Sequence, residues 1–157
     1  MNDFISYPNT IDCKTYNLIK DTSDDINSLE KRINNDFAPR SSSSTFNVIY
    51  CYYFIEKKFS YPNGDSNILY IGESEGEKHQ SSKSLGFRFA HCKQGTDNKI
   101  NICLRHYYEC GEKLAIDIYD LPLSLCRKAE ELKLRKNFLE KYHAMPIADG
   151  ASSTTKS

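Results

Sequence analysis

The spacing of hydrophobic and polar positions divides the chain into a polar N-terminal part and a more apolar remainder. Residues 1–45 carry few apolar anchors, but Ile26, Leu29 and Ile33 recur at helical spacing within them. This pattern predicts one amphipathic helix. The Pro-Arg-Ser-Ser-Ser-Ser run at 39–44 is typical of a linker. We therefore interpret residues 1–45 as an N-terminal helical arm that ends in a serine-rich linker.

From residue 46 the chain has the composition of strands. Residues 46–59 are rich in β-branched and aromatic side chains, and residues 67–72 repeat that composition. Between the two segments, the run Pro62-Asn63-Gly64-Asp65 is a concentrated turn signal. The two segments therefore predict an antiparallel hairpin.

The pattern after the hairpin predicts helices around one further strand. In chain order we expect a polar loop, two short helices, a third strand and a long helix, over residues 73–84, 85–95, 100–110, 113–122 and 124–143. Gly111 closes the second short helix, and Pro146 lies just past the long one. Residues 46–149 are therefore predicted to form an α+β domain, a small three-stranded antiparallel sheet flanked by helices, followed by a disordered tail at 150–157.

Composition and charge limit the class of partner. The chain has 157 residues, of which 39% are hydrophobic and 27% charged, as in an ordinary globular domain. Its 21 basic and 21 acidic residues cancel, so a nucleic acid would need a local basic patch. No run is long enough to span a bilayer, and no signal peptide is recognisable at the start. We therefore expect no membrane partner, a cytoplasmic location (nuclear in a eukaryote) and reduced thiols at the six scattered cysteines.

Five sequence features occur in a fixed order along residues 46–149. They are Val48-Ile49-Tyr50, Tyr70-Ile71-Gly72, Arg88 with His91, the adjacent acids Glu130 and Glu131, and Pro146 with Asp149. This ordered set resembles the GIY-YIG nuclease superfamily, in which a three-stranded antiparallel sheet is flanked by helices. Members of that family cut phosphodiester bonds in DNA with one divalent cation. The resemblance therefore implies DNA as the partner and Mg²⁺ (or Mn²⁺) as the cofactor.

The resemblance also implies a catalytic role for each matching residue. Tyr50 would deprotonate or orient the attacking water, and Tyr70 would hydrogen-bond the same water or the phosphate. Arg88 would offer its guanidinium fork to the phosphate oxygens, and His91 would relay a proton or bind phosphate. Glu131 would hold the cation.

The remaining candidates concern substrate binding. Gly72 would let the backbone turn sharply and leave room for the substrate. Glu73 follows it where some branches of the family carry a basic residue, and Lys78 or Lys83 would supply that charge instead. The first motif begins with Val48 in place of its glycine, and Asp149 replaces the asparagine that closes the family pattern.

Several of these residues also have plain structural interpretations. A strand tyrosine usually packs, and Glu130 and Glu131 are typical of a solvated helix face; Glu130 is also the alternative metal ligand. Cys103, His106 and Cys110 share one helical face and would form a zinc site with His91 and Cys92 nearby. No paired ligands at CxxC-like spacing accompany them, so cysteines of the core are the commoner interpretation.

We therefore predict a metal-dependent DNA endonuclease, with the arm adding contacts to DNA or to a second copy of the chain in a homodimer. No large DNA-reading domain accompanies the motifs, which favours a restriction or defence enzyme. A structure-specific or repair nuclease is the alternative, and a non-catalytic nucleic-acid-binding module is a further one. Basic residues of the long helix would hold the DNA backbone if they converge beside the site.

Overall fold

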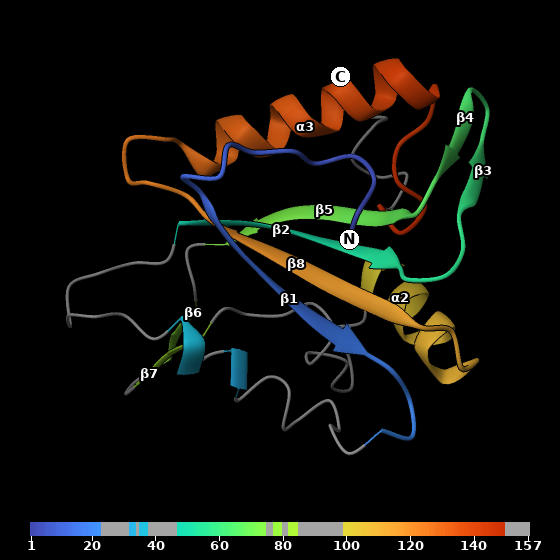
Figure 1. The fold of residues 1–157 in the computed structure, drawn as a ribbon, viewed down its shortest axis with the longest axis horizontal. Coiled ribbons are helices and arrows are strands. Elements are labelled where there is room, and N and C mark those ends of the chain that lie inside the picture. Colours follow the sequence, from blue (N-terminus) through green and yellow to red (C-terminus); the bar gives the residue numbers. More distant parts are fainter. Residues whose placement is uncertain are drawn as a thin grey trace.

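An antiparallel sheet forms the centre of the molecule. The computed structural model describes residues 1–22, 32–33, 35–37, 47–74, 77–79, 82–84 and 99–149. Among these, the main sheet has four strands in the order β1-β8-β2-β5 (Figure 1). The strands are β1 (Asp12–Leu18), β2 (Val48–Phe54), β5 (Ile68–Ser74) and β8 (Leu114–Asp120). With its helices, the chain belongs to the α+β class, as predicted.

The sheet has one strand more than the three predicted. The additional strand, β1, lies within the segment interpreted as a helical arm and pairs antiparallel with β8 along its whole length. Its apolar alternation consists of only Tyr16 and Leu18, and its other residues are exposed. Because so short an alternation hardly differs from its polar surroundings, the sequence pattern did not reveal the strand.

Part of the predicted N-terminal helix is present. Residues 32, 33, 35 and 36 are helical, and the Phe37 amide donates to the Ile33 carbonyl at 3.1 Å. Ile33 and Phe37 are buried against the sheet. The rest of that helix, the serine-rich linker, the helix predicted over 85–95 and the tail from residue 150 lie outside the described residues.

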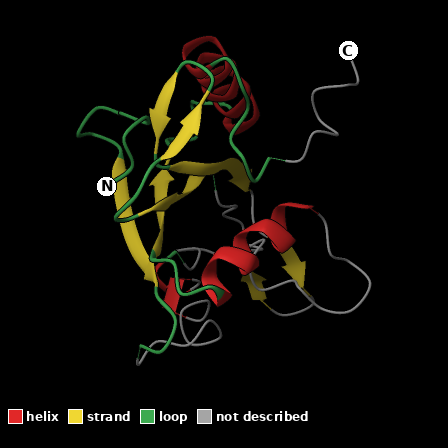
Figure 2. Ribbon diagram, turned by 90° about the vertical axis from the view of Figure 1, so that its right-hand side faces the viewer, coloured by secondary structure: helices red, strands yellow, loops and turns green. Residues whose placement is uncertain are grey.

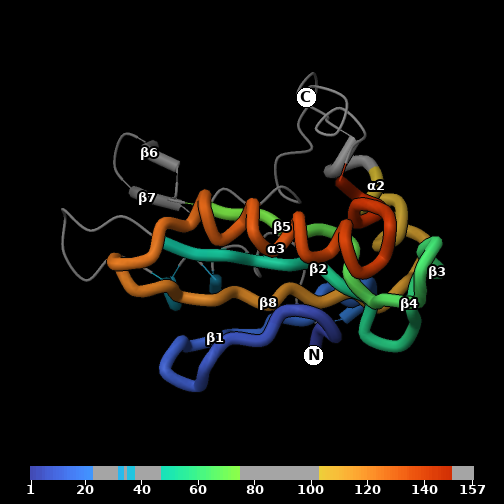
Figure 3. The backbone as a smooth tube through the Cα atoms, turned by 90° about the horizontal axis from the view of Figure 1, so that it is seen from above, coloured from blue at the N-terminus to red at the C-terminus, as the bar shows by residue number. Residues whose placement is uncertain are grey.

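Two helices cover opposite faces of the sheet, as Figure 2 shows. They are α2 (Lys99–Glu109) and α3 (Arg127–Tyr142), which match the predicted helices at 100–110 and 124–143. Even-numbered residues of β2 join the core cluster that includes α2, and odd-numbered residues join the cluster that includes α3. Successive strand residues point to opposite faces, so β2 is buried along its whole length. Figure 3 shows α3 running over β5 and β2.

Two small hairpins extend from the main sheet. The predicted turn at Pro62 and Asn63 joins β3 (Phe59–Tyr61) to β4 (Gly64–Ser66), an insertion between β2 and β5. The segment predicted as a polar loop contains β6 (Glu77–His79) and β7 (Ser82–Ser84), which pair with each other. Their polar sequences lack the apolar alternation that signals a strand. Neither described α-helix is long and apolar enough to cross a bilayer.

A fully buried carboxylate, Asp117, joins three elements on the α3 face. It lies in β8 with 0% exposure. Its Oδ1 accepts hydrogen bonds from the Thr15 hydroxyl at 2.6 Å and the Tyr53 hydroxyl at 2.9 Å. Its Oδ2 accepts from Nδ2 of the Asn2 side chain at 2.6 Å and from the Asn2 backbone N–H at 3.4 Å. A buried charge needs such donors to offset its lost hydration. The Asp117 network therefore fixes the N-terminal segment and β1 to the sheet.

The N-terminal segment also packs on α3. The Phe4 ring lies 5.1 Å from that of Phe138 in an edge-on arrangement, and the Tyr7 ring lies 5.2 Å from that of Tyr119. Ile5 is buried in the same cluster. The N-terminal segment therefore connects α3 to the sheet through Phe4, Ile5 and Tyr7.

The free energy of unfolding should fall at alkaline pH because the phenol of Tyr61, in the β3–β4 hairpin, is buried. Burial raises the pKa of Tyr61 to about 12. Its hydroxyl donates to the Ile68 carbonyl at 2.8 Å and accepts from the Ile147 amide at 3.0 Å. A raised pKa in the folded state favours the neutral phenol, so this stabilisation is complete below pH 10 and is lost as the pH rises toward 12.

Urea unfolding at a series of pH values would measure this effect. We expect Tyr61→Phe to cost about 1 kcal/mol at pH 7 through its lost hydrogen bonds, and the gap to the wild type to close above pH 10. A gap that stays constant up to pH 12 would contradict the role given to Tyr61.

Candidate active site

The pairing of β2 with β5 brings the two motif tyrosines together. In the register of this pair, Tyr50 lies opposite Gly72 and Tyr52 lies opposite Tyr70. Tyr50 and Tyr70 therefore point to the same face, and their ring centroids are 6.1 Å apart. Both side chains are nearly buried, with exposures of 3% and 4%, and both belong to the core cluster of the α2 face.

The rings of Tyr50 and Tyr70 fill the space that a side chain at residue 72 would need. A Cβ atom at this residue would lie 2.7 Å from both Cζ and the hydroxyl oxygen of Tyr50, and 2.8 Å from Cε1 of Tyr70. These separations are too short for carbon contacts. The strand continues through Gly72 to Ser74, so the sharp backbone turn expected here is absent. The room that the glycine leaves is filled by the tyrosines.

Five charged residues gather where α3 and the segment that follows it meet β5. We call Glu73, Arg127, Glu131, Arg135 and Asp149 the β5-edge charge cluster. Arg135 donates from Nη1 to Oε1 of Glu131 at 3.2 Å and from Nη2 to Oδ2 of Asp149. Arg127 donates from Nε to Oε2 of Glu73 at 2.6 Å. The cluster contains three carboxylates and two guanidinium groups, a formal charge of −1.

The charge cluster is shielded from water. The Asp149 side chain is 5% exposed and that of Glu131 is 16% exposed. Burial raises the pKa of Glu131; Arg135 opposes this shift, and the charges of Glu73 and Asp149 add to it. Glu73, an acid where a base was expected, is paired with the first residue of α3.

Glu130 and Glu131 point to different neighbours. The Tyr7 hydroxyl donates to Oε2 of Glu130 at 3.1 Å, so Glu130 lies against the N-terminal segment. Burial and this bond to Glu130 raise the pKa of Tyr7. Glu131 instead lies with Arg135 and Asp149. Of the two acids, Glu131 is the one that belongs to the charge cluster.

The tyrosine pair and the charge cluster lie on opposite faces of the sheet but share one strand. Tyr70 packs in the α2 face, whereas Glu73 reaches Arg127 at the start of α3. β5 is the last strand in the sheet order, and the chain beyond α3 runs along it, with the Ala148 amide donating to the Leu69 carbonyl at 2.9 Å. The segment that carries Asp149 therefore runs beside β5 and brings this acid to Arg135 of α3.

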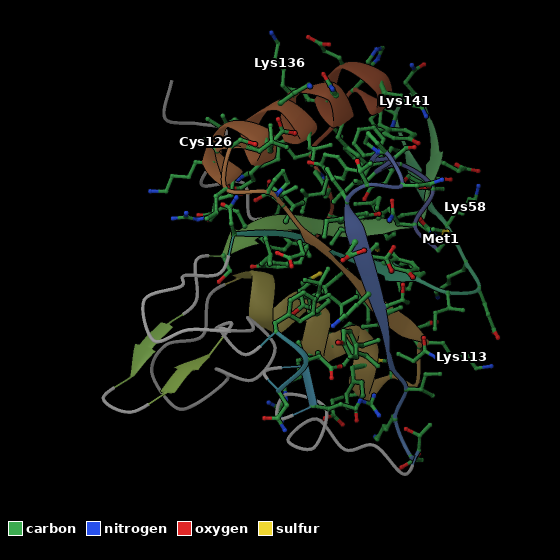
Figure 4. All side chains as sticks on the ribbon, turned by 60° about the vertical axis from the view of Figure 1, so that its left-hand side comes forward. Met1, Lys58, Lys113, Cys126, Lys136 and Lys141 are labelled. Carbon is green, nitrogen blue, oxygen red and sulfur yellow. The ribbon has the colours of Figure 1, made fainter. Side chains whose placement is uncertain are left out.

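The other predicted site residues are only partly accounted for. Arg88 and His91 lie outside the described residues. Lys78 and Lys83 are direct partners in the β6–β7 pair. On α3, Lys136 lies on the outer side of the helix and Cys126 just before its start (Figure 4). The Lys141 ammonium lies 5.9 Å from the centre of the Phe4 ring.

No zinc site is seen in the described part of the chain. His106 Nε2 lies 3.7 Å from Cys110 Sγ, a two-residue contact, and Cys103 packs against the core. Among the described residues, no group of three or more histidines, cysteines or acids has the geometry of a metal site. Mg²⁺ commonly binds through one or two carboxylates and keeps several waters, so Glu131 as a single carboxylate ligand fits such an ion.

Arg127 and Arg135 are among the basic residues of the long helix that were expected to hold the DNA backbone, but their guanidinium groups bind acids of the charge cluster. Arg135 follows Glu131 by four residues, a helical spacing at which opposite charges meet, and this signal was available. The Glu73–Arg127 pair joins residues 54 apart, and no local pattern marks it.

Comparisons of the chain with protein-family models, curated proteins and solved structures find no significant match.

Proposed function

We propose that the chain is a metal-dependent DNA endonuclease of the GIY-YIG type, acting in restriction or defence, with structure-specific or repair cleavage as the alternative. The observation that carries the proposal is the register of β2 and β5, which sets Tyr50 opposite Gly72 and both motif phenols over that glycine. The antiparallel order β5-β2-β8 within the four-stranded sheet supports it, because the resemblance implies a sheet of three antiparallel strands.

The proposed reaction is hydrolysis of a phosphodiester. A water oxygen forms a bond to phosphorus while the bond from phosphorus to the 3′ oxygen breaks, leaving a 5′ phosphate and a 3′ hydroxyl. Tyr50 accepts the proton of the water if its phenol is ionised, or orients the water while the proton passes to solvent, and the departing 3′ oxygen takes up a proton from solvent. Tyr70 hydrogen-bonds the water or the phosphate. Arg88, as the resemblance implies, would bind the non-bridging oxygens.

Glu131 would hold the cation in this scheme. A bound Mg²⁺ or Mn²⁺ supplies Lewis-acid stabilisation of the charge that develops on the phosphate and the leaving oxygen. The partial burial of Glu131 and the −1 charge of its cluster support this assignment over Glu130. Asp149 contributes by binding Arg135.

Cleavage of plasmid, branched and single-stranded DNA with Mg²⁺ or EDTA tests the proposal. We expect Tyr50→Phe and Glu131→Gln each to lower cleavage by about 100-fold or more, because each removes a group that acts on the reacting atoms. Tyr52→Phe and Glu130→Gln are matched controls, since they change a neighbouring tyrosine and the neighbouring acid. Cleavage that is independent of metal, or wild-type rates in both active-site variants, would overturn the mechanism.

A non-catalytic nucleic-acid-binding module is the second candidate. Burial of Tyr50 and Tyr70 on the face opposite Glu131 favours it, because a phosphate would have to reach both groups around the edge of β5. The same assay separates the two functions. DNA binding without cleavage in the presence of Mg²⁺ and Mn²⁺ would favour the module.

A further inference from the structure

We propose that Arg135 is a positioning residue that fixes the Glu131 carboxylate for a divalent cation by tying it to Asp149. This inference rests on the proposed function, because it takes Glu131 as the cation ligand. It assigns a role to a residue that lies outside the motifs of the resemblance.

The guanidinium of Arg135 divides its donors between two elements. Nη1 donates to Glu131 one helical turn earlier on α3, and Nη2 donates to Asp149 in the segment along β5. A planar guanidinium holds two acceptors in a fixed mutual geometry, which the single ammonium of a lysine does not. Arg135 therefore links the orientation of the Glu131 side chain to the edge of the sheet.

The hydrogen bond to Arg135 leaves half of the Glu131 carboxylate available. Arg135 contacts Oε1, and within the described part of the chain Oε2 accepts no hydrogen bond. Because the hydrogen bond to Oε1 fixes the carboxylate, Oε2 is held in one position. A single anionic oxygen of this kind suits an ion that keeps several waters of its own. Arg135 thus acts on the far side of the carboxylate as an outer-shell partner of a metal ligand does.

Burial distinguishes this contact from an ordinary surface ion pair. The side chains of Arg135 and Asp149 are 18% and 5% exposed. On the same helix, Lys136 and Glu140 form a pair at 3.9 Å whose side chains are 75% and 64% exposed. Exposed pairs of that kind restrict their side chains little. Lys136 therefore offers a control that removes one positive charge from α3 without changing the contact to Glu131.

Mn²⁺ binding, measured from the electron paramagnetic resonance signal of the free ion, tests the inference without requiring cleavage. We expect Arg135→Lys and Arg135→Gln to weaken Mn²⁺ binding about 10- to 100-fold, as loss of an outer-shell partner does. Asp149→Ala, which removes the acceptor at the other end of this contact, should weaken Mn²⁺ binding in the same direction. Lys136→Gln should bind like the wild type, and Glu131→Gln should remove the site. In cleavage, Arg135→Lys should recover its rate at saturating Mg²⁺.

The outcomes separate this inference from the proposed function. Wild-type affinity in Arg135→Lys would mean that charge alone matters, and tighter binding in Arg135→Gln would make Arg135 a competitor of the cation; either result overturns the inference. A wild type without a Glu131-dependent Mn²⁺ site would overturn both proposals. A wild type that binds Mn²⁺ through Glu131 but cuts no DNA would overturn only the proposed function, and the affinities of the Arg135 variants would still decide the role of Arg135.

Discussion

Replacing Asp117 with alanine should lower the free energy of unfolding by about 3–5 kcal/mol, the largest stability loss that we expect in this chain. The substitution leaves the side-chain donors of three residues, Asn2, Thr15 and Tyr53, without their common acceptor. Hydrogen bonds to a charged group are each worth about 1.5–3 kcal/mol, and three that share one acceptor are not additive. A domain of this size has only about 5–15 kcal/mol in total.

Urea unfolding of a graded set of variants would check this prediction. Asp117→Asn keeps one acceptor oxygen and should fall between the wild type and Asp117→Ala. Asp12→Ala removes an exposed acid from β1 and should change stability by less than about 0.5 kcal/mol. A loss below about 1 kcal/mol in Asp117→Ala would mean that the donors find other acceptors, which would overturn the role given to the network.

Adding one methyl group at Gly72 should impair both stability and cleavage. In Gly72→Ala, the new Cβ would lie within 2.8 Å of both tyrosine rings, so the rings must move. Overpacking of a buried site costs about 1–3 kcal/mol. If Tyr50 and Tyr70 act on the attacking water, a shift of about 1 Å should reduce cleavage on the order of 100-fold.

Two further variants separate the causes of this effect. Gly111→Ala meets no atom within 4 Å but has a φ of +83°, so it should lose stability through backbone strain and keep its cleavage rate. In a Tyr50→Ala background, Gly72→Ala should cost less stability, because one of the two rings that its Cβ would contact is gone. Equal costs in both backgrounds, measured by thermal unfolding, would show that the close approach to Tyr50 is not the cause.

The elements with long, regular patterns were predictable from the sequence. The apolar and aromatic composition of β2 and β5, the alternation of β8 and the helix formers of α3 each extend over several residues and agree with their neighbours. β1 was missed because only two of its side chains are buried, and the β6–β7 pair because it is polar. β1 forms because it pairs with β8, about 100 residues later in the chain, and local sequence patterns do not encode such pairing.

The sequence indicated which residues form the candidate site better than it indicated how they are arranged. The hairpin order predicts that β2 and β5 pair, but their register passes a bulge after Tyr52 and an inserted hairpin, so the sequence did not indicate that Tyr50 lies opposite Gly72. The buried network of Asp117 was equally hidden. An acid between two isoleucines of an alternating strand looks like an outward position, and its partners lie 64 to 115 residues away.

The pairing of β1 with β8 has a consequence for the order in which the domain folds. The first strand of the sheet can pair only with a strand that begins about 100 residues later, so synthesis must pass Asp120 before the sheet can be completed. Contacts this distant in sequence slow the closing step of folding. We expect the β2–β5 hairpin to form first on the ribosome and the N-terminal strand to wait in an unpaired state. Pauses in translation before Asp120 would then lengthen the time for which β1 is exposed to chaperones and proteases.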